Sequence, residues 1–373
     1  RIYNDILSGR DDRLAVDRLQ QLLAGKKPAG GLVTLTLDPK LQAAAYNAIS
    51  GRPGAVVALD AKTGEILALV SSPSYDPNSL SSNNPTAIRD AYTRLSQDGA
   101  APMANRPYTM SLPPGSTFKL VVAAAALTSG KYTPNSMLPA PASLKLPNST
   151  NRLHNWQGDK CDPSGQVTLQ RALEISCNTA FAWLGMQLGG DALRAQAEAF
   201  GFNDSVVTPL VSAASVFPGG LDGAQTAMSA IGQFDVRATA MQMAMVVAAI
   251  SNQGALMAPQ LIKRVESADY ELIEKFERKN LSQSISSSVA NSLLKMLYST
   301  VTNGTASSGQ IAGVKVGAKT GTAESGTIAP PHAWFVATAE VGGRTLAIAV
   351  VVENGGGAAE VSGNRIAGPI AAA

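Results

Sequence analysis

The chain has 373 residues and a formal net charge of +3, from 30 Lys and Arg against 27 Asp and Glu. Its length predicts one large domain with a smaller appendage. The slight charge, without a basic stripe interleaved with aromatic residues, argues against a nucleic-acid partner. Two histidines and two cysteines cannot support a rich metal site, so we expect neither a metal nor another cofactor. No apolar run approaches the roughly 18 residues of a membrane span.

The early part of the chain predicts a short linker followed by the first strands. Residues 1–32 are charged and helical in pattern, and we interpret them as the end of an N-terminal pedestal or linker. The remaining residues, 33–373, are expected to form the main domain. A strand is expected at residues 32–39, and a hairpin is expected to pair residues 55–60 with residues 65–70.

The middle of the chain alternates between polar segments and helical patterns. Residues 71–110 are rich in Ser, Asn, Pro and Asp and predict a long surface loop, and residues 133–151 are also irregular. An apolar helix is expected at residues 120–127, directly after the heptapeptide 113–119, which contains two prolines and a glycine. Further helices are expected at residues 168–188, 192–200, 225–231, 238–250 and 286–301.

The last third of the chain changes from the helical period to the strand period. A strand at residues 314–322 precedes a hairpin of residues 333–341 and 344–352. Two early strands, three late strands and helices between them predict an α+β fold. We expect a five-stranded antiparallel sheet, flanked by helices, with an inserted all-helical lobe.

Ser116 and Lys119 are the strongest catalytic candidates in the sequence. They are three residues apart at the start of the apolar helix, so they share one helix face. A buried lysine amine with a lowered pKa can take the proton of a serine hydroxyl and make the serine a nucleophile. The first-turn amides also favour the oxyanion that forms when serine attacks a carbonyl. The plainer interpretation is an N-cap serine beside a lysine that reaches solvent.

Two further motifs could complete a serine acylase. The triplet 176–178, Ser-Cys-Asn, offers a second proton carrier and a side-chain amide that can hold the substrate. The segment 319–322, Lys-Thr-Gly-Thr, ends a strand, and its glycine permits close approach of another backbone. Alternation puts the two threonines on one face, so Lys319 must reach the site along its stem or through strand twist.

Each motif also occurs elsewhere in the chain, and the context separates the copies. Ser292 and Lys295 repeat S-x-x-K inside a helix, where the serine amide is already used in a helical hydrogen bond. A second Lys-Thr-Gly at residues 62–64 lies at a hairpin tip, where Gly64 serves the turn and Lys62 faces solvent. Further S-x-N triplets begin at Ser81, Ser149 and Ser362.

The ordered set S-x-x-K, S-x-N and K-T-G is typical of penicillin-binding proteins and class A β-lactamases. From about residue 33 to its end, the chain resembles class B penicillin-binding proteins, and within them the actinobacterial penicillin-binding protein A type. The resemblance implies a peptidoglycan D,D-transpeptidase with the fold shared by penicillin-binding transpeptidases and serine β-lactamases. Phe234 departs from the family, which usually has Gly there. Further similar segments lie at residues 37–42, 55–68, 74–78, 105–106, 230–233, 242–249 and 333–336.

The resemblance implies a role for each catalytic residue. Ser116 would be acylated by the penultimate D-Ala of a stem peptide, with release of the terminal D-Ala. Lys119 would act as the base, and Ser176 would pass the proton to the leaving amine. Lys319 would place positive charge behind that serine. An amine from a neighbouring stem peptide would then attack the ester and close the cross-link.

Substrate binding, by the same resemblance, would involve neighbouring side chains and backbone amides. Asn178 would hold the substrate amide, while Thr320 and Thr322 would bind its carboxylate beside Gly321. Backbone amides of Ser116 and Thr322 would form the oxyanion hole. β-Lactams would acylate Ser116 because they mimic the D-Ala-D-Ala end.

The expected partners are peptidoglycan stem peptides, β-lactam antibiotics and other cell-wall synthesis proteins, with no nucleic acid. The resemblance places the domain at the extracytoplasmic face of the bacterial cytoplasmic membrane. A signal or membrane anchor is expected upstream of the given sequence.

Three alternative functions remain open. A D,D-carboxypeptidase or β-lactamase of the same fold would hydrolyse the acyl-enzyme, although the sequence has no Glu-x-x-Leu-Asn loop to position a deacylating water. A β-lactam sensor would be acylated without turnover. A zinc site built from Cys161, Cys177 and His154 lacks a fourth ligand at a standard spacing.

The remaining candidate residues have simpler interpretations. Cys161 and Cys177 could form a disulfide worth roughly 3 kcal/mol, or they could be two buried thiols. His154 and His332 have no evident carboxylate partner, which favours a surface or pocket-rim position for both. Glu198 follows a helical pattern before a glycine and is expected to be solvated.

Overall fold

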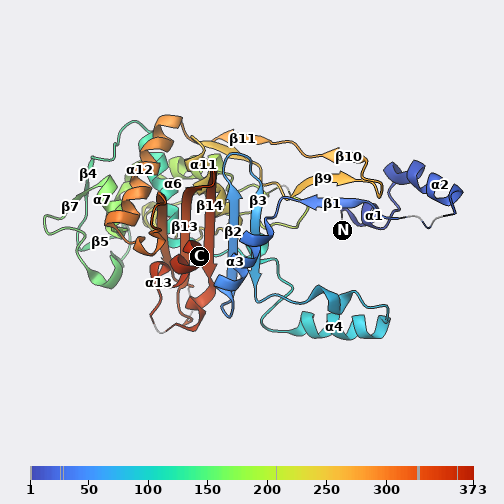
Figure 1. The fold of residues 1–373 in the computed structure, drawn as a ribbon. Coiled ribbons are helices and arrows are strands. Elements are labelled where there is room, and N and C mark those ends of the chain that lie inside the picture. Colours follow the sequence, from blue (N-terminus) through green and yellow to red (C-terminus); the bar gives the residue numbers. More distant parts are fainter. Residues whose placement is uncertain (1, 26, 28, 207, 326–327, 359) are drawn as a thin grey trace.

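A five-stranded antiparallel sheet organises the molecule (Figure 1). The computed structural model describes residues 2–25, 27, 29–206, 208–325, 328–358 and 360–373. Two strands from early in the chain pair with three from its end, which confirms the predicted sheet. In spatial order the strands are β12 (Val316–Ala323), β13 (His332–Val341), β14 (Arg344–Val352), β2 (Gly54–Asp60) and β3 (Ile66–Ser72).

One face of this sheet is covered by the two helices α3 (Pro39–Ile49) and α13 (Gly363–Ala372). Val56, Val350 and Phe335 are paired across three neighbouring strands and belong to the apolar cluster under these helices. Because side chains alternate between the two faces of a strand, the next residues along point to the opposite face. The sheet therefore has an apolar cluster on each side.

The opposite face packs against the helical lobe, which is inserted between β3 and β12. Its central helix α11 (Ala240–Ser251) contacts β2, β13 and β14, and every residue from Ala240 to Ile250 is buried. A helix that is apolar on all sides is expected at the centre of a core. The other helices of the lobe are α6 (Lys119–Thr128), α7 (Leu169–Glu174), α8 (Asn178–Leu188), α9 (Gly190–Ala199), α10 (Gly223–Ser229) and α12 (Ser287–Asn303).

The prediction of a long surface loop at residues 71–110 is wrong in two respects. It contains the helix α4 (Pro85–Gln97), which projects from the body of the molecule (Figure 1), and the short helix α5 (Arg106–Thr109), whose residues Arg106 and Tyr108 are buried. α4 begins with Asn84 as N-cap and proline at its first position, which are standard start signals. Ile88, Ala91 and Leu95 stand at helical spacing, but the Ser, Asn and Pro residues before them favour a loop, and only Ala91 of α4 is buried.

Several short strands also differ from the prediction. The strand expected at residues 32–39 is β1 (Leu32–Leu35), and it pairs with β9 (Ile262–Glu266) outside the main sheet. The irregular segment 133–151 contains two strands of small hairpins. The other short strands are β4 (Met137–Pro139), β5 (Ser143–Lys145), β6 (Arg152–His154), β7 (Gln166–Thr168), β8 (Ala255–Met257), β10 (Leu272–Lys275) and β11 (Asn280–Gln283).

The N-terminal segment contains the helices α1 (Asn4–Leu7) and α2 (Ala15–Leu23), in line with its helical pattern. Within the residues that the structure describes, no helix combines the length and the apolar character needed to cross a membrane.

Candidate active site

Ser116 lies on a 3-10 turn (Gly115–Phe118) that leads directly into α6. The turn is attached to the core on two sides. Trp334 of β13 donates its indole N–H to the carbonyl of Pro113 at 2.9 Å, and the N–H of Gly115 donates to the carbonyl of Gly232 at 3.0 Å. Gly115 has φ 53°, a conformation that favours glycine. The half-buried Ser116 is therefore presented from a fixed backbone.

Lys119 is fully buried in the first turn of α6, and its amine faces the S-x-N triplet. Its Nζ donates to the carbonyl of Ser176 and to Oδ1 of Asn178, both at 2.7 Å, and lies 3.3 Å from the Ser176 hydroxyl. Among the described residues, the Ser116 hydroxyl has no hydrogen-bond partner. The proton transfer from Ser116 to Lys119 thus stays a prediction.

Ser176 interrupts the helical pattern that predicts one helix over residues 168–188. α7 ends at Glu174, α8 begins at Asn178, and Ser176 has φ 58° in the turn between them. This turn directs the Ser176 hydroxyl to the amine of Lys319, which lies 2.9 Å away. The S-x-N triplet and the K-T-G strand therefore meet at this serine.

The strand register explains how Lys319 reaches the site. Lys319 is paired with Val336, and Val336 with Ala349, both of which belong to the apolar cluster on the lobe side of the sheet. The Lys319 side chain thus points toward the lobe and is fully buried. Thr320 is paired with Phe335, which belongs to the cluster on the other face.

The two buried amines have no carboxylate among their hydrogen-bond partners in the described part of the chain. Burial, and to a lesser extent the nearby charge of Lys319, holds the pKa of Lys119 well below its ordinary value. Burial also lowers the pKa of Lys319 to about 7. A lysine with such a lowered pKa can be neutral near neutral pH, as a general base must be.

Residues 320–322, near the end of β12, lie at the outer edge of the sheet beside the turn that carries Ser116. Gly321 lies against the nucleophile turn, because a Cβ built on it would be 2.9 Å from the carbonyl oxygen of Pro114. Thr322 is half-buried, and its carbonyl oxygen would be 2.9 Å from a Cβ on Gly115. The Thr320 hydroxyl lies 3.0 Å from the hydroxyl of Thr305. Within the described part of the chain, β12 pairs with β13 alone, so its other edge can pair with an extended peptide.

The family model described as "Penicillin binding protein transpeptidase domain" matches residues 54–373. The chain belongs to the penicillin-binding protein transpeptidase family. This confirms the resemblance drawn from the three motifs.

Individual relatives of this transpeptidase support the same family. It is 40% identical over 379 residues to "Peptidoglycan D,D-transpeptidase PbpA" of Mycolicibacterium smegmatis, covering 99% of this chain and 77% of the relative. A ceftriaxone acyl-enzyme complex of penicillin-binding protein A from M. tuberculosis is 40% identical, with a TM-score of 0.95 over 99% of this chain and 85% of that one. PBP2 of Pseudomonas aeruginosa is 31% identical, with a TM-score of 0.78 over 92% of this chain and 75% of that one.

The two cysteines of this transpeptidase form a disulfide, with an S–S distance of 2.01 Å. Of the two states left open by the sequence, a disulfide or two buried thiols, the structure has the disulfide. Bridged cysteines are not free thiols, and they cannot serve as ligands of the zinc site considered above. The disulfide ties the residue that precedes Asn178 to the loop after β6.

Asn155 and Thr305 contact the catalytic motifs but were missed by sequence reasoning. Asn155 accepts hydrogen bonds from the first N–H groups of α8, and Thr305 contacts Thr320. Neither residue stands at a motif spacing from its partners. Their proximity comes from tertiary structure, so we find no sequence signal that would have identified them.

The duplicate motifs lie in the contexts that the sequence predicts. Ser292 is half-buried within α12 and donates to the carbonyl of Ser288, and Lys62 is exposed on the β2–β3 hairpin. Gly64 has φ 77° in that hairpin. Phe234, at a position usually occupied by Gly in the family, takes the same left-handed region with φ 61° and is 39% exposed.

The histidines and Glu198 have different environments. His154 is exposed, whereas the expected surface or rim position of His332 is wrong: it is buried, and its Nδ1 accepts from the N–H of Asn354 at 3.1 Å. Burial lowers the pKa of His332. Glu198 is exposed and pairs with Arg194 at 2.8 Å, as a solvated helix residue should.

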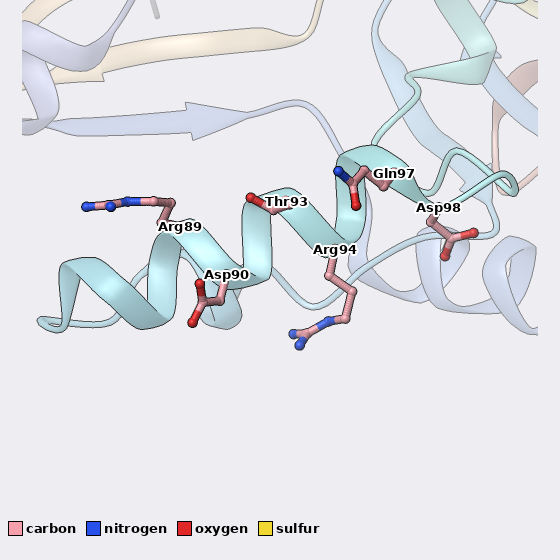
Figure 2. A pocket seen from close by; sticks show the side chains of 6 residues that line it. All are labelled: Arg89, Asp90, Thr93, Arg94, Gln97 and Asp98. Atoms are coloured by element: carbon pink, nitrogen blue, oxygen red, sulfur yellow. The ribbon is translucent and has the colours of Figure 1, made fainter.

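A shallow hollow of about 550 Å³ lies along α4, which precedes the three motifs in the chain (Figure 2). Figure 2 shows that its side chains point to different sides of the helix, with Arg89 and Thr93 directed away from Asp90 and Arg94. They do not converge on one point as a ligand site requires. None of the lining residues belongs to the catalytic motifs.

Proposed function

We propose that this protein is a peptidoglycan D,D-transpeptidase that forms an acyl-enzyme on Ser116. The observation that carries this proposal is the arrangement of Lys119 and Lys319 around Ser176. Two buried amines contact one hydroxyl, beside a serine on a rigid turn. This arrangement can move a proton between a nucleophile and a leaving amine without a carboxylate or a metal ion in the set.

Acylation begins when the Ser116 oxygen attacks the carbonyl carbon of the penultimate D-Ala. The neutral Lys119 amine takes the hydroxyl proton as the C–O bond forms. Backbone N–H groups of Ser116 and Thr322 stabilise the negative oxygen of the tetrahedral intermediate. Its collapse breaks the C–N bond, and the terminal D-Ala amine receives a proton through Ser176. An ester on Ser116 and free D-Ala are the products.

Deacylation completes the cross-link. The amine of a neighbouring stem peptide attacks the ester carbonyl, an amide bond forms, and the proton returns to the Ser116 oxygen. A β-lactam follows the first step, but its leaving amine stays attached to the acyl group because it belongs to the opened ring. It can therefore block the entry of the second peptide, and the adduct persists.

Substrate orientation comes from β12 and α8. Asn178 holds the substrate amide, while Thr320 and Thr322 bind the terminal carboxylate, with Gly321 allowing the substrate backbone to approach the strand edge. We place the enzyme at the extracytoplasmic face of the bacterial membrane, where its substrate lies and where a disulfide persists. Other cell-wall synthesis proteins are the expected partners, and the transpeptidase domain is assigned to residues 33–373.

Intact-mass measurement with benzylpenicillin tests the proposed nucleophile. The parent chain should gain the mass of one drug molecule, and Ser116→Ala should gain none. The absence of an adduct on the parent would refute the proposal.

Incubation with a D-Ala-D-Ala peptide and an acceptor amine separates the related activities. A cross-linked product indicates a transpeptidase, whereas D-Ala release without cross-linking indicates a carboxypeptidase. Rapid β-lactam turnover indicates a β-lactamase, and an adduct without activity on any peptide indicates a sensor.

A further inference from the structure

The turn that carries Ser176 and Asn178 lacks a local side-chain cap. Only three residues separate α7 from α8, and Ser176 has φ 58°. The N-cap residue of α8 is Cys177, whose sulfur lies 3.6 Å from the Thr179 hydroxyl but makes no cap hydrogen bond to the backbone N–H groups of the helix. Its sulfur is in the disulfide and carries no hydrogen to donate. The first N–H groups of α8 therefore need an acceptor from elsewhere in the chain.

Asn155 supplies this acceptor from the segment after β6. Its Oδ1 accepts from the N–H of Asn178 at 3.0 Å and from the N–H of Thr179 at 3.1 Å. Its Nδ2 donates to the carbonyl of Asp159 at 3.0 Å. Both ends of this buried amide are used, and the opposite orientation would place an NH₂ group against two N–H donors. Asn155 thus acts as a remote cap for α8.

The neighbouring carbonyl of His154 orients the Asn178 side chain. Nδ2 of Asn178 donates to this carbonyl at 3.2 Å, which leaves Oδ1 to accept from Lys119 at 2.7 Å. The Ser176 carbonyl accepts from the same amine at 2.7 Å. Both short hydrogen bonds of the Lys119 amine therefore depend on where the turn and the first residues of α8 lie.

We propose that Asn155 is a positioning residue for acyl transfer, acting through Asn178 and Lys119. This inference rests on the proposed function of those two residues. Without the Asn155 oxygen, two N–H groups lose their acceptor and the start of α8 can shift. A displacement of about 1 Å at a catalytic group can reduce a rate by about 100-fold.

The test compares Asn155→Ala and Asn155→Asp with the parent chain, with Asn151→Ala as control because Asn151 is exposed nearby. The readout is the second-order rate of acylation by benzylpenicillin across a pH series. Asn155→Ala should be slowed by about 10- to 100-fold. It should also move the acid limb of the profile to lower pH, because the protonated amine loses an acceptor. Asn155→Asp keeps the acceptor for α8 but loses the N–H that donates to Asp159, so it should be slowed less than Asn155→Ala at pH 8, and Asn151→Ala should match the parent.

Acylation of Asn155→Ala at the parent rate would overturn the inference. An equal fall in the acylation rate of both Asn155 variants, with an unchanged pH profile, would also overturn the inference, because it would indicate that Asn155 has only a structural role. If Asn155→Ala does not fold, Asn155→Ser takes its place with the same expectations, since the shorter side chain withdraws the oxygen. A parent chain that forms no adduct would refute the proposed function itself, and with it this inference.

Discussion

Lys319 and Ser176, 143 residues apart in the sequence, meet across the boundary between the sheet and the helical lobe, with Nζ 2.9 Å from the hydroxyl oxygen. Lys119 contacts the same serine from the lobe side. Because both amines are fully buried, protonation of one disfavours protonation of the other. Ser176 thus links two groups whose charge states are coupled.

We expect the free energy of unfolding to rise with pH between about 7 and 10.5. Lys319 has a pKa of about 7 in the folded chain and an ordinary value of 10.5 when exposed by unfolding. The unfolded chain binds more protons across this window, so stability increases with pH. Lys119 contributes to the same trend because burial also lowers its pKa. Urea denaturation at several pH values measures how steeply the free energy of unfolding rises with pH. Lys319→Met should make this rise less steep, and an unchanged rise would show that Lys319 is not its source.

Gly321→Ala should slow acylation of Ser116 by about 10- to 100-fold. The added Cβ would lie 2.9 Å from the Pro114 carbonyl oxygen and 3.0 Å from a methyl group of Thr117, so the nucleophile turn must move. The benzylpenicillin acylation rate measures the effect. Gly99→Ala is the matched control because a Cβ there meets no atom within 4 Å. Parent-like acylation of Gly321→Ala would show that the turn tolerates displacement.

Thr305→Val should raise the KM for a D-Ala-D-Ala peptide by about tenfold with a smaller effect on kcat. The Thr305 hydroxyl lies 3.0 Å from that of Thr320, the proposed carboxylate ligand, and valine removes this partner while keeping a similar shape. Thr305→Ser should restore the parent KM. Thr302→Val is the control, since Thr302 is exposed on α12. An equal fall in kcat for both Thr305 variants would argue against a role in carboxylate binding.

Arg106→Ala should destabilise the fold by about 3 kcal/mol. The Arg106 guanidinium pairs with Glu353 at 2.8 Å and donates to the carbonyls of Ala100 and Ala101, and the arginine side chain is only 8% exposed. Its removal leaves a partly buried carboxylate without its partner. Chemical denaturation measures the loss. Arg194→Ala, which breaks an exposed ion pair, should cost less than about 1 kcal/mol of stability. Equal losses of stability in the two variants would show that the buried pair contributes no more than the exposed one.

Reduction of the Cys161–Cys177 disulfide should lower the free energy of unfolding by about 3 kcal/mol, because it releases a loop of the unfolded chain. Denaturation with and without reductant measures the change. A variant with both cysteines replaced by serine should be insensitive to reductant. Two reactive thiols in unreduced, denatured protein would show that the bridge does not form.

Most of the sheet could be predicted from the sequence because strands such as β2 and β14 contain continuous apolar runs. Val56 and Val350 belong to such runs, and both are buried in the same cluster. The direction of Lys319 could not be predicted, since either strand face was compatible with the local pattern. The pairing of Lys319 with Val336 decides it, and that register involves residues from another strand.

Other parts of the site depend on contacts that sequence spacing does not reveal. Asn155 contacts residues 23 and 24 positions away, and Asn155 itself lies in a polar segment that predicts only a loop. The break at Ser176 was missed because apolar residues on both sides continue the helical period. α4 was missed because its apolar residues, such as Ile88 and Leu95, lie within a segment rich in Ser, Asn, Pro and Asp, a composition that favours a loop.

Because β2 pairs with β14, which lies near the end of the chain, the active site can form only late in protein synthesis. The ribosome completes Ser116, Lys119 and Ser176 well before it completes β12 and Lys319. A nascent chain that stops before the last strands cannot close the sheet, and its serine lacks the second amine. Long-range strand pairing is also slow to form. Antibiotic capture by the growing chain should therefore begin only once translation has released the C-terminal strands.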